Sequence, residues 1–158
     1  MTYPRQFNWF ESTCRSLRAS VPEASETANY VTVRLAMLLL GRLPQELAQE
    51  VLSLLPDEAR AWFRARRELP PDQSISFPAF VEISRYLLGL SDLLDSPKYS
   101  ESEEEYDALC SHMAEAFLWA FAQELPTDLK DRIAHHLPAD LRCRMNLYSR
   151  FSDSEKVA

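Results

Sequence analysis

The chain has 158 residues, a formal net charge of −7 at pH 7, 46% hydrophobic residues and two glycines. Hairpin turns and phosphate-binding loops need glycine, so this composition disfavours sheet-rich folds and nucleotide-binding loops and favours helices. The cysteines, at positions 14, 110 and 143, have no CxxC spacing and predict neither a disulfide framework nor a zinc site.

The negative charge is concentrated in the second half of the chain. Residues 1–70 carry nine Lys and Arg against eight Asp and Glu, whereas residues 71–158 carry eight against sixteen. Such an acidic chain is a poor general binder of nucleic acids and anionic membranes. The longest apolar run, residues 35–40, is far too short to span a bilayer, and residues 1–5 have no signal-peptide character. We expect a cytoplasmic protein without membrane insertion.

In chain order, the first predicted helix lies near residues 5–18, where Phe7, Phe10 and Leu17 recur at helical spacing. A second helix, near residues 24–41, is apolar around most of its circumference, which is typical of a helix in the middle of a bundle. These two segments therefore supply the first half of the expected core.

Two short helices follow, and each is expected to begin at the proline of a Leu-Pro pair, Pro44 and Pro56. Proline suits the first helical position because it lacks the N–H that would stay unpaired there, and it disfavours the helical conformation of the residue before it. Glu46 and Glu58 come two positions later, where a negative charge meets the positive end of the helix dipole.

This pair of short helices occurs twice. Residues 43–60 align with residues 125–142 at an offset of 82, and six of the 18 aligned residues are identical, where unrelated segments give about one. Arg60 and Arg142 stand at the same position of the two copies. We therefore expect both to make the same structural contact, with a carboxylate or a carbonyl of a neighbouring helix.

The first two helices also return in the second half. The first returns at an offset of 70, with Ser76 as a candidate N-cap ahead of Phe77. The second returns near residues 101–122, where Ser100 and Glu103 are expected to form a capping box. Because the offset grows from 70 to 82, twelve residues have been inserted between these two helices.

We therefore predict an all-α protein made of two four-helix repeats, packed against each other with approximate internal two-fold symmetry. The first repeat spans residues 1–69 and the second spans residues 70–158, and together they are expected to form one cooperative domain. The insertion lies near residues 90–102 and is either a functional loop or a surface insertion that the fold tolerates.

The tandem pattern resembles a known bacterial family. A Phe-x-x-Phe helix, an apolar helix, Leu-Pro-x-x-Leu and a second Leu-Pro-x-x-x-Arg, all in tandem, are similar to the family called domain of unknown function 2267 over about residues 7–148. The resemblance implies an all-helical tandem fold in a bacterial protein, without an established activity and without catalytic residues to carry over. The insertion near residues 90–102 departs from the compact pattern of that family.

Two groups of residues are candidate binding sites. The first is a basic patch with an interleaved aromatic ring, formed by Trp62, Arg64, Arg66 and Arg67. It could bind phosphate or an acidic partner, or it could be a solvated helix face. The second is a group of aromatic side chains on the central helix of the second copy, formed by Phe117, Trp119 and Phe121. It could line a ligand pocket, or it could pack in the core.

Patterns that carry catalysis or bind metals are scarce. The three histidines, at 112, 135 and 136, do not have the spacing of a metal site with Cys110 or Cys143. The acidic run over residues 101–107 is typical of a solvated first helical turn. There is no Gly-x-Ser-x-Gly, Walker or Rossmann pattern. We predict no catalytic residues, no metal site and no cofactor.

These observations favour a non-enzymatic protein-interaction or regulatory module, whose partner is another protein or a second copy of this chain. One alternative is a carrier that binds a small molecule or pigment in a pocket between the repeats, since helical bundles hold ligands between their helices. A further alternative is nucleic-acid binding through the local arginine patch, against which the acidic total argues.

Overall fold

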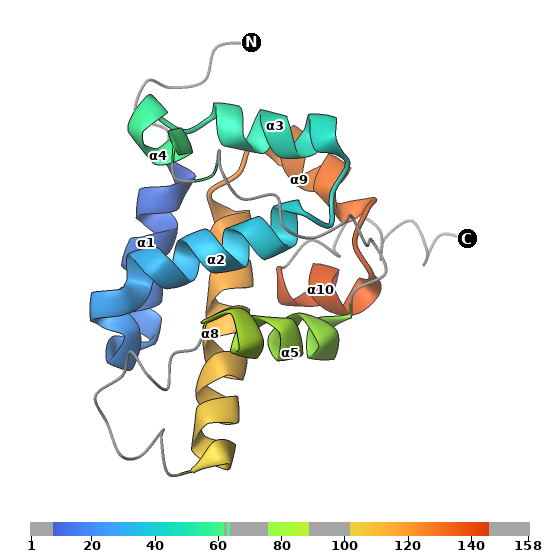
Figure 1. The fold of residues 1–158 in the computed structure, drawn as a ribbon. Helices are drawn as coiled ribbons and strands as arrows, with labels where there is room; N and C mark the ends of the chain where they lie inside the picture. Colours follow the sequence, from blue (N-terminus) through green and yellow to red (C-terminus); the bar gives the residue numbers. More distant parts are fainter. Residues whose placement is uncertain (1–7, 62, 64–75, 89–101, 146–158) are drawn as a thin grey trace.

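The computed structural model describes residues 8–61, 63, 76–88 and 102–145, and within these ranges it contains helices and no strand. The first part comprises α1 (Trp9–Ser20), the 3₁₀ helix η1 (Pro22–Thr27), α2 (Ala28–Leu40), α3 (Gln45–Ser53) and α4 (Asp57–Ala61). The second part comprises α5 (Phe77–Leu88), α8 (Glu103–Gln123), α9 (Thr127–Ala134) and α10 (Ala139–Arg144). The predicted all-α class is confirmed (Figure 1). The insertion near residues 90–102 lies almost entirely outside the described ranges.

None of the described helices is both long enough and apolar enough to cross a membrane.

The four Leu-Pro pairs within the described ranges do mark helix starts, but the helices begin one residue later than expected. The carbonyl oxygens of four prolines accept the first helical N–H at 3.0–3.1 Å, and these are Pro44, Pro56, Pro126 and Pro138. The backbone ψ angle of the proline is extended, at 146° for Pro44 and 150° for Pro126. Each of these prolines is therefore the N-cap residue, whose carbonyl joins the helix while its own backbone does not.

Two of the longer helices begin with a serine cap. At α5, Ser76 Oγ accepts the N–H of Ala79 at 3.3 Å, as the sequence predicted. At α8, the cap is Ser102, whose side chain accepts the N–H of Glu105 at 3.3 Å. The predicted capping box of Ser100 and Glu103 was wrong, because Glu103 is the first helical residue and the same serine-to-glutamate spacing occurs two residues later.

The longest described helix, α8, is the element around which the others pack. In Figure 1 it runs upright from the bottom of the view to just below α3 and α9, with α1 beside it and α2 crossing it. Helices α5 and α10 also pack on α8, and α2 packs against both α1 and α5. At one end of the bundle, α3 and α9 lie side by side (Figure 1).

An aromatic cluster fills the core where α1 meets α8. The ring of Trp9 lies 5.0 Å from that of Phe121 in an edge-to-face arrangement, and 5.9 Å from that of Phe63. Phe10 also meets Phe63, at 6.0 Å. Edge-to-face pairs at such separations are favourable because the ring edge is positive and the ring face negative. The cluster thus links α1 to the second half of the chain.

Trp9 also makes a buried polar contact with α3. Its indole Nε1 donates a hydrogen bond to the carbonyl oxygen of Val51 at 2.9 Å, across 42 residues of sequence, and both residues are fully buried. The last carbonyls of a helix lack the usual i+4 donor. The Val51 carbonyl accepts the N–H of Leu54 at 3.3 Å, and the indole of Trp9 supplies a second, shorter hydrogen bond. One side chain therefore joins α1, α3 and α8.

A second tertiary contact joins α5 to α10. The N–H of Phe77, the first residue of α5, donates to Asp140 Oδ2 at 2.8 Å, so a carboxylate from α10 caps α5. The guanidinium of Arg144 lies 3.8 Å from the ring centroid of Phe77, which is cation–π geometry. Phe77 is buried, and these contacts hold the start of α5 against α10.

Arg60 and Arg142 do not make the same contact, contrary to what their equivalent positions led us to expect. Arg60 pairs with Asp57 within α4, three residues earlier. Arg142 donates instead to the carbonyl oxygen of Leu137, just ahead of α10, at 2.9 Å. Residue 139, the equivalent of Asp57, is alanine, so the second copy lacks the carboxylate that Arg60 uses.

We predict that Trp9→Phe destabilises the fold by roughly 1–3 kcal/mol, because it removes a buried hydrogen bond and leaves the Val51 carbonyl with only the longer 3.3 Å contact from the N–H of Leu54. The matched control is Trp119→Phe, the same change at a half-exposed position, which should stay within about 0.5 kcal/mol of the parent. Urea unfolding of both variants measures the difference. Equal midpoints for the two would show that the Trp9 hydrogen bond contributes nothing to stability.

Candidate interaction site

Helix α8 has a buried side and an exposed side. Its buried side chains include Leu109, Met113, Phe117 and Phe121, which belong to the core. Exposed positions recur every three or four residues along the other side, and we call them the α8 stripe: Glu104, Ala108, His112, Glu115, Trp119 and Gln123. This spacing places them on one face of the helix. The stripe is therefore a continuous line of exposed side chains along the central helix.

Trp119 stands out on this stripe. It is 52% exposed, and every other large hydrophobic residue whose side chain the structure describes is buried or half-buried. Phe117 and Phe121 are fully buried, and their rings stack at 5.5 Å. The predicted aromatic group is thus divided: two members pack in the core, and the third points to the surface.

A helical projection accounts for this division. Successive residues of an α-helix are about 100° apart, so Trp119 is rotated about 200° from both Phe117 and Phe121. The opposite orientation of Trp119 follows from the spacing of the three residues. It was missed because the three rings were grouped by their proximity in sequence. Trp119 therefore belongs with Glu115 and Gln123, one helical turn to either side of it.

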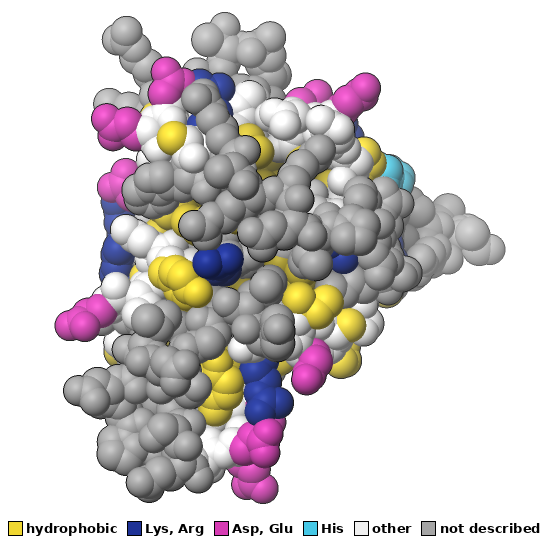
Figure 2. Space-filling view, viewed as in Figure 1, with side chains coloured by type: hydrophobic (Ala, Val, Ile, Leu, Met, Phe, Trp, Pro, Cys, Tyr) yellow, Lys and Arg dark blue, Asp and Glu magenta, His cyan; other side chains and the backbone are white. Residues whose placement is uncertain are grey.

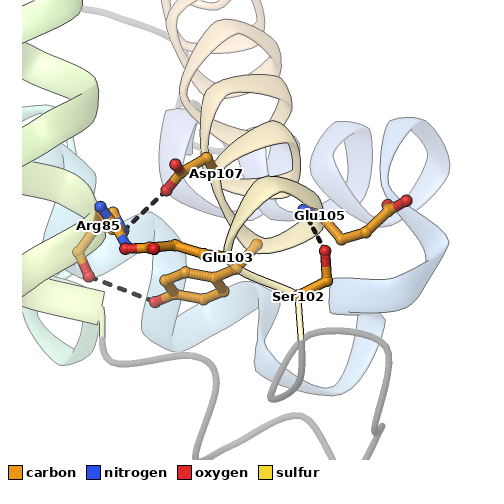
Figure 3. A network of polar contacts seen from close by, with 6 residues as sticks. Arg85, Ser102, Glu103, Glu105 and Asp107 are labelled. Carbon is orange, nitrogen blue, oxygen red and sulfur yellow. Dashed lines mark hydrogen bonds and ion pairs between the residues drawn. The ribbon is translucent and has the colours of Figure 1, made fainter.

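A polar network lies at the start of α8, where it meets α5 (Figure 3). Arg85 of α5 forms ion pairs with Glu103 at 2.6 Å and with Asp107 at 2.9 Å. The hydroxyl of Tyr106 donates to the backbone carbonyl of Arg85 at 3.3 Å, and the guanidinium lies 5.8 Å from the Tyr106 ring centroid. Two carboxylates and an aromatic ring of α8 thus hold one arginine.

The network is electrostatically favourable but lies in solvent. The hydrogen bond that Arg85 donates to the Glu103 carboxylate raises the pKa of Arg85 above its usual value, and the nearby Asp107 carboxylate adds to this effect. The side chains of Glu103 and Asp107 are 76% and 51% exposed, so water and salt screen these pairs. In the space-filling view, acidic side chains gather where α8 begins, next to basic ones (Figure 2).

The acidic run at the start of α8 is therefore only partly the solvated turn that its sequence predicted. Glu104 is exposed, whereas Glu103 and Asp107 engage Arg85, which lies on a different helix. The spacing of Glu103 and Asp107 places them on one face of α8. It was the packing of α5 against that face that brought the arginine to them.

The other predicted binding group, Trp62, Arg64, Arg66 and Arg67, lies outside the described residues. Over the residues that are described, no three His, Cys, Asp or Glu side chains are grouped as a metal site would need. A shallow depression of about 680 Å³ lies at the start of α3, lined by Pro44, Gln45, Glu46 and Gln49. The candidate ligand-pocket residues, Phe117, Trp119 and Phe121, do not line this depression.

Comparison with protein-family models, with curated proteins and with solved structures finds no match to this chain in any of the three. The resemblance to the domain of unknown function 2267 family accordingly stays a prediction.

We predict that the three cysteines differ sharply in reactivity. Burial raises the pKa of Cys14 and of Cys110, which lowers the fraction of reactive thiolate at any pH near neutrality, while Cys143 is exposed. Iodoacetamide should therefore modify Cys143 first and reach the other two only in denaturant. Peptide mapping by mass spectrometry measures the order. Modification of Cys110 in the folded protein as fast as Cys143 would contradict the burial of that face of α8.

Proposed function

We propose that this chain is a non-enzymatic protein-interaction or regulatory module that engages its partner through the α8 stripe. The observation that carries the proposal is the 52% exposure of Trp119 on the helix that forms the centre of the bundle. Single exposed aliphatic residues are ordinary on protein surfaces. Tryptophan is different, because it is among the residues most enriched at the energetic centres of protein interfaces.

The position of Trp119 also suits a docking residue. It projects from a 21-residue helix whose opposite face is packed against the core, so its backbone is rigidly placed. A side chain held on a rigid element loses little conformational freedom on binding, and this improves affinity. Glu115 and Gln123, one turn away on either side, supply the polar surroundings that commonly border an interface aromatic.

We also propose that the fold is the tandem repeat predicted from the sequence, with two four-helix units related by an approximate two-fold axis. Three features support it. The first helix of one unit packs on the second helix of the other in both directions, as α1 with α8 and as α5 with α2. The third helices of the two units, α3 and α9, pack against each other.

The third feature is an ion pair between equivalent positions. Glu50 of α3 pairs with Arg132 of α9, and the two are 82 residues apart, which is the offset of the repeat. Equivalent residues meet each other only where a two-fold axis passes between them. Because Glu50 and Arg132 carry opposite charges, their ion pair stabilises the contact between the two units.

The charge pair yields a prediction about stability. Arg132→Glu would place two carboxylates together, and Glu50→Arg would place two guanidinium groups together, so each single change should destabilise by about 0.2–1 kcal/mol. The exchanged variant, Glu50→Arg with Arg132→Glu, should recover most of this loss. Urea unfolding of the four proteins at low salt forms a double-mutant cycle. Losses that simply add in the exchanged variant would contradict the pairing.

The interaction proposal is tested by site-specific photo-cross-linking. The full chain carries benzoylphenylalanine at position 119 or, as a control, at Glu11, an exposed position on α1. In native extracts, position 119 should form a discrete adduct with one partner and position 11 should not. Unlabelled parent protein should compete the adduct away, whereas unlabelled Trp119→Glu should not. An identical adduct at both positions, or none at 119, would refute the proposed function.

A further inference from the structure

We infer that the partner segment that docks on the α8 stripe bears arginine, and that an arginine side chain of the partner stacks on Trp119 beside the carboxylate of Glu115. This inference rests on the proposed function, because it specifies the chemistry of the partner at the same site. It is carried by three independent properties of α8: its charge, the direction of its dipole and the way it already binds Arg85.

The first property is the charge of the helix. Over residues 103–123, α8 contains four glutamates and one aspartate but neither lysine nor arginine. Two of these carboxylates, Glu103 and Asp107, pair with Arg85. Glu115 takes part in no ion pair with any described residue. An exposed carboxylate thus lies one helical turn from the exposed indole, and no described residue neutralises it.

The second property is the place of Trp119 near the C-terminal end of α8. The helix ends at Gln123, four residues later, and no basic residue occupies its last turn. The C-terminal end of a helix carries a partial negative charge and favours nearby cations. Both the helix end and Glu115 therefore attract positive charge to the ring, and the same field repels the phosphates of nucleic acids and anionic lipids.

The third property is that α8 already holds one arginine in the arrangement we infer. At its other end, Arg85 lies over the Tyr106 ring and between the carboxylates of Glu103 and Asp107 (Figure 3). That arginine comes from α5, within the same chain. Trp119 and Glu115 repeat the combination of aromatic ring and carboxylate, but here no described residue supplies the cation.

Arginine fits this surface better than lysine. Its guanidinium is planar, so it can lie flat on the indole while its N–H groups reach the carboxylate beside the ring. Tryptophan is also the strongest cation–π partner among the aromatic side chains. A lysine ammonium is more strongly hydrated and cannot stack in this way, so it would gain less from the same surface.

The test uses the full chain labelled with fluorotryptophan, and a short blocked peptide that carries several arginines. Controls are the same peptide with lysine, and with citrulline, a neutral isostere, in place of arginine. The chain has three tryptophans, and the fluorine resonance of Trp119 is assigned from Trp119→Phe. The arginine peptide should shift the Trp119 resonance saturably and leave that of the buried Trp9 in place, and the lysine peptide should bind more weakly.

Calorimetry with the same peptide then separates the site from the general charge of the helix. Trp119→Ala and Glu115→Gln should each weaken binding about two- to fivefold. Glu104→Gln is the matched control. It removes the same charge from the same stripe, but at a position about 22 Å from Trp119 along the helix axis. It should weaken binding less than Glu115→Gln does. Thermal melts should be unchanged in all three variants, since these side chains are exposed.

Three outcomes would overturn the inference. Citrulline or lysine peptides that bind as tightly as the arginine peptide would remove the requirement for a guanidinium. Equal effects of Glu104→Gln and Glu115→Gln would show that the attraction is diffuse. A partner that is cross-linked at position 119 through a segment without arginine would overturn the inference while leaving the proposed function intact. Absence of any cross-link at position 119 refutes the function itself, so the two failures are distinguishable.

Discussion

The structure depends most on the burial of Trp9. Its ring meets Phe121 of α8, and its N–H satisfies the Val51 carbonyl at the end of α3. Both contacts stabilise the packing, because a large aromatic surface would return to water if α8 moved, and a buried hydrogen bond between α1 and α3 would break if α3 moved. Helices from both halves of the chain are thus held by one residue of α1. This ties the two halves into one core.

The packing that secures α8 also decides what remains on its surface. Helices α1, α2, α5 and α10 contact it, which leaves the α8 stripe and the acidic first turns of α8 open to solvent. Aromatic residues on the covered faces stabilise the fold, as the stacked Phe117 and Phe121 do. Trp119 makes no comparable contribution, since half of its surface stays in water. A residue of this kind is better explained by binding than by stability, and this is the basis of the function we propose.

The two ends of α8 show how one chemistry serves two purposes. At the start of the helix, Arg85 forms ion pairs with two carboxylates and lies over an aromatic ring. These interactions join α5 to α8. Near the other end, Trp119 and Glu115 offer a similar surface, without a described cation. We propose that this second surface serves association with another chain, because no described residue supplies the positive charge that would complete it.

The sequence by itself determined the helical class and most helix starts, because glycine content, periodicity, proline and serine caps act over one or two turns of chain. It also located the buried faces, since residues such as Phe117 and Phe121 follow the helical period. It did not predict the hydrogen bonds of Arg85, Trp9 or Phe77, whose partners lie 18 to 63 residues away. Which helices cover the buried face of α8, and how much of Trp119 stays exposed on the opposite face, was decided only by tertiary packing. Such contacts depend on how whole helices fit together, and no local pattern encodes that fit.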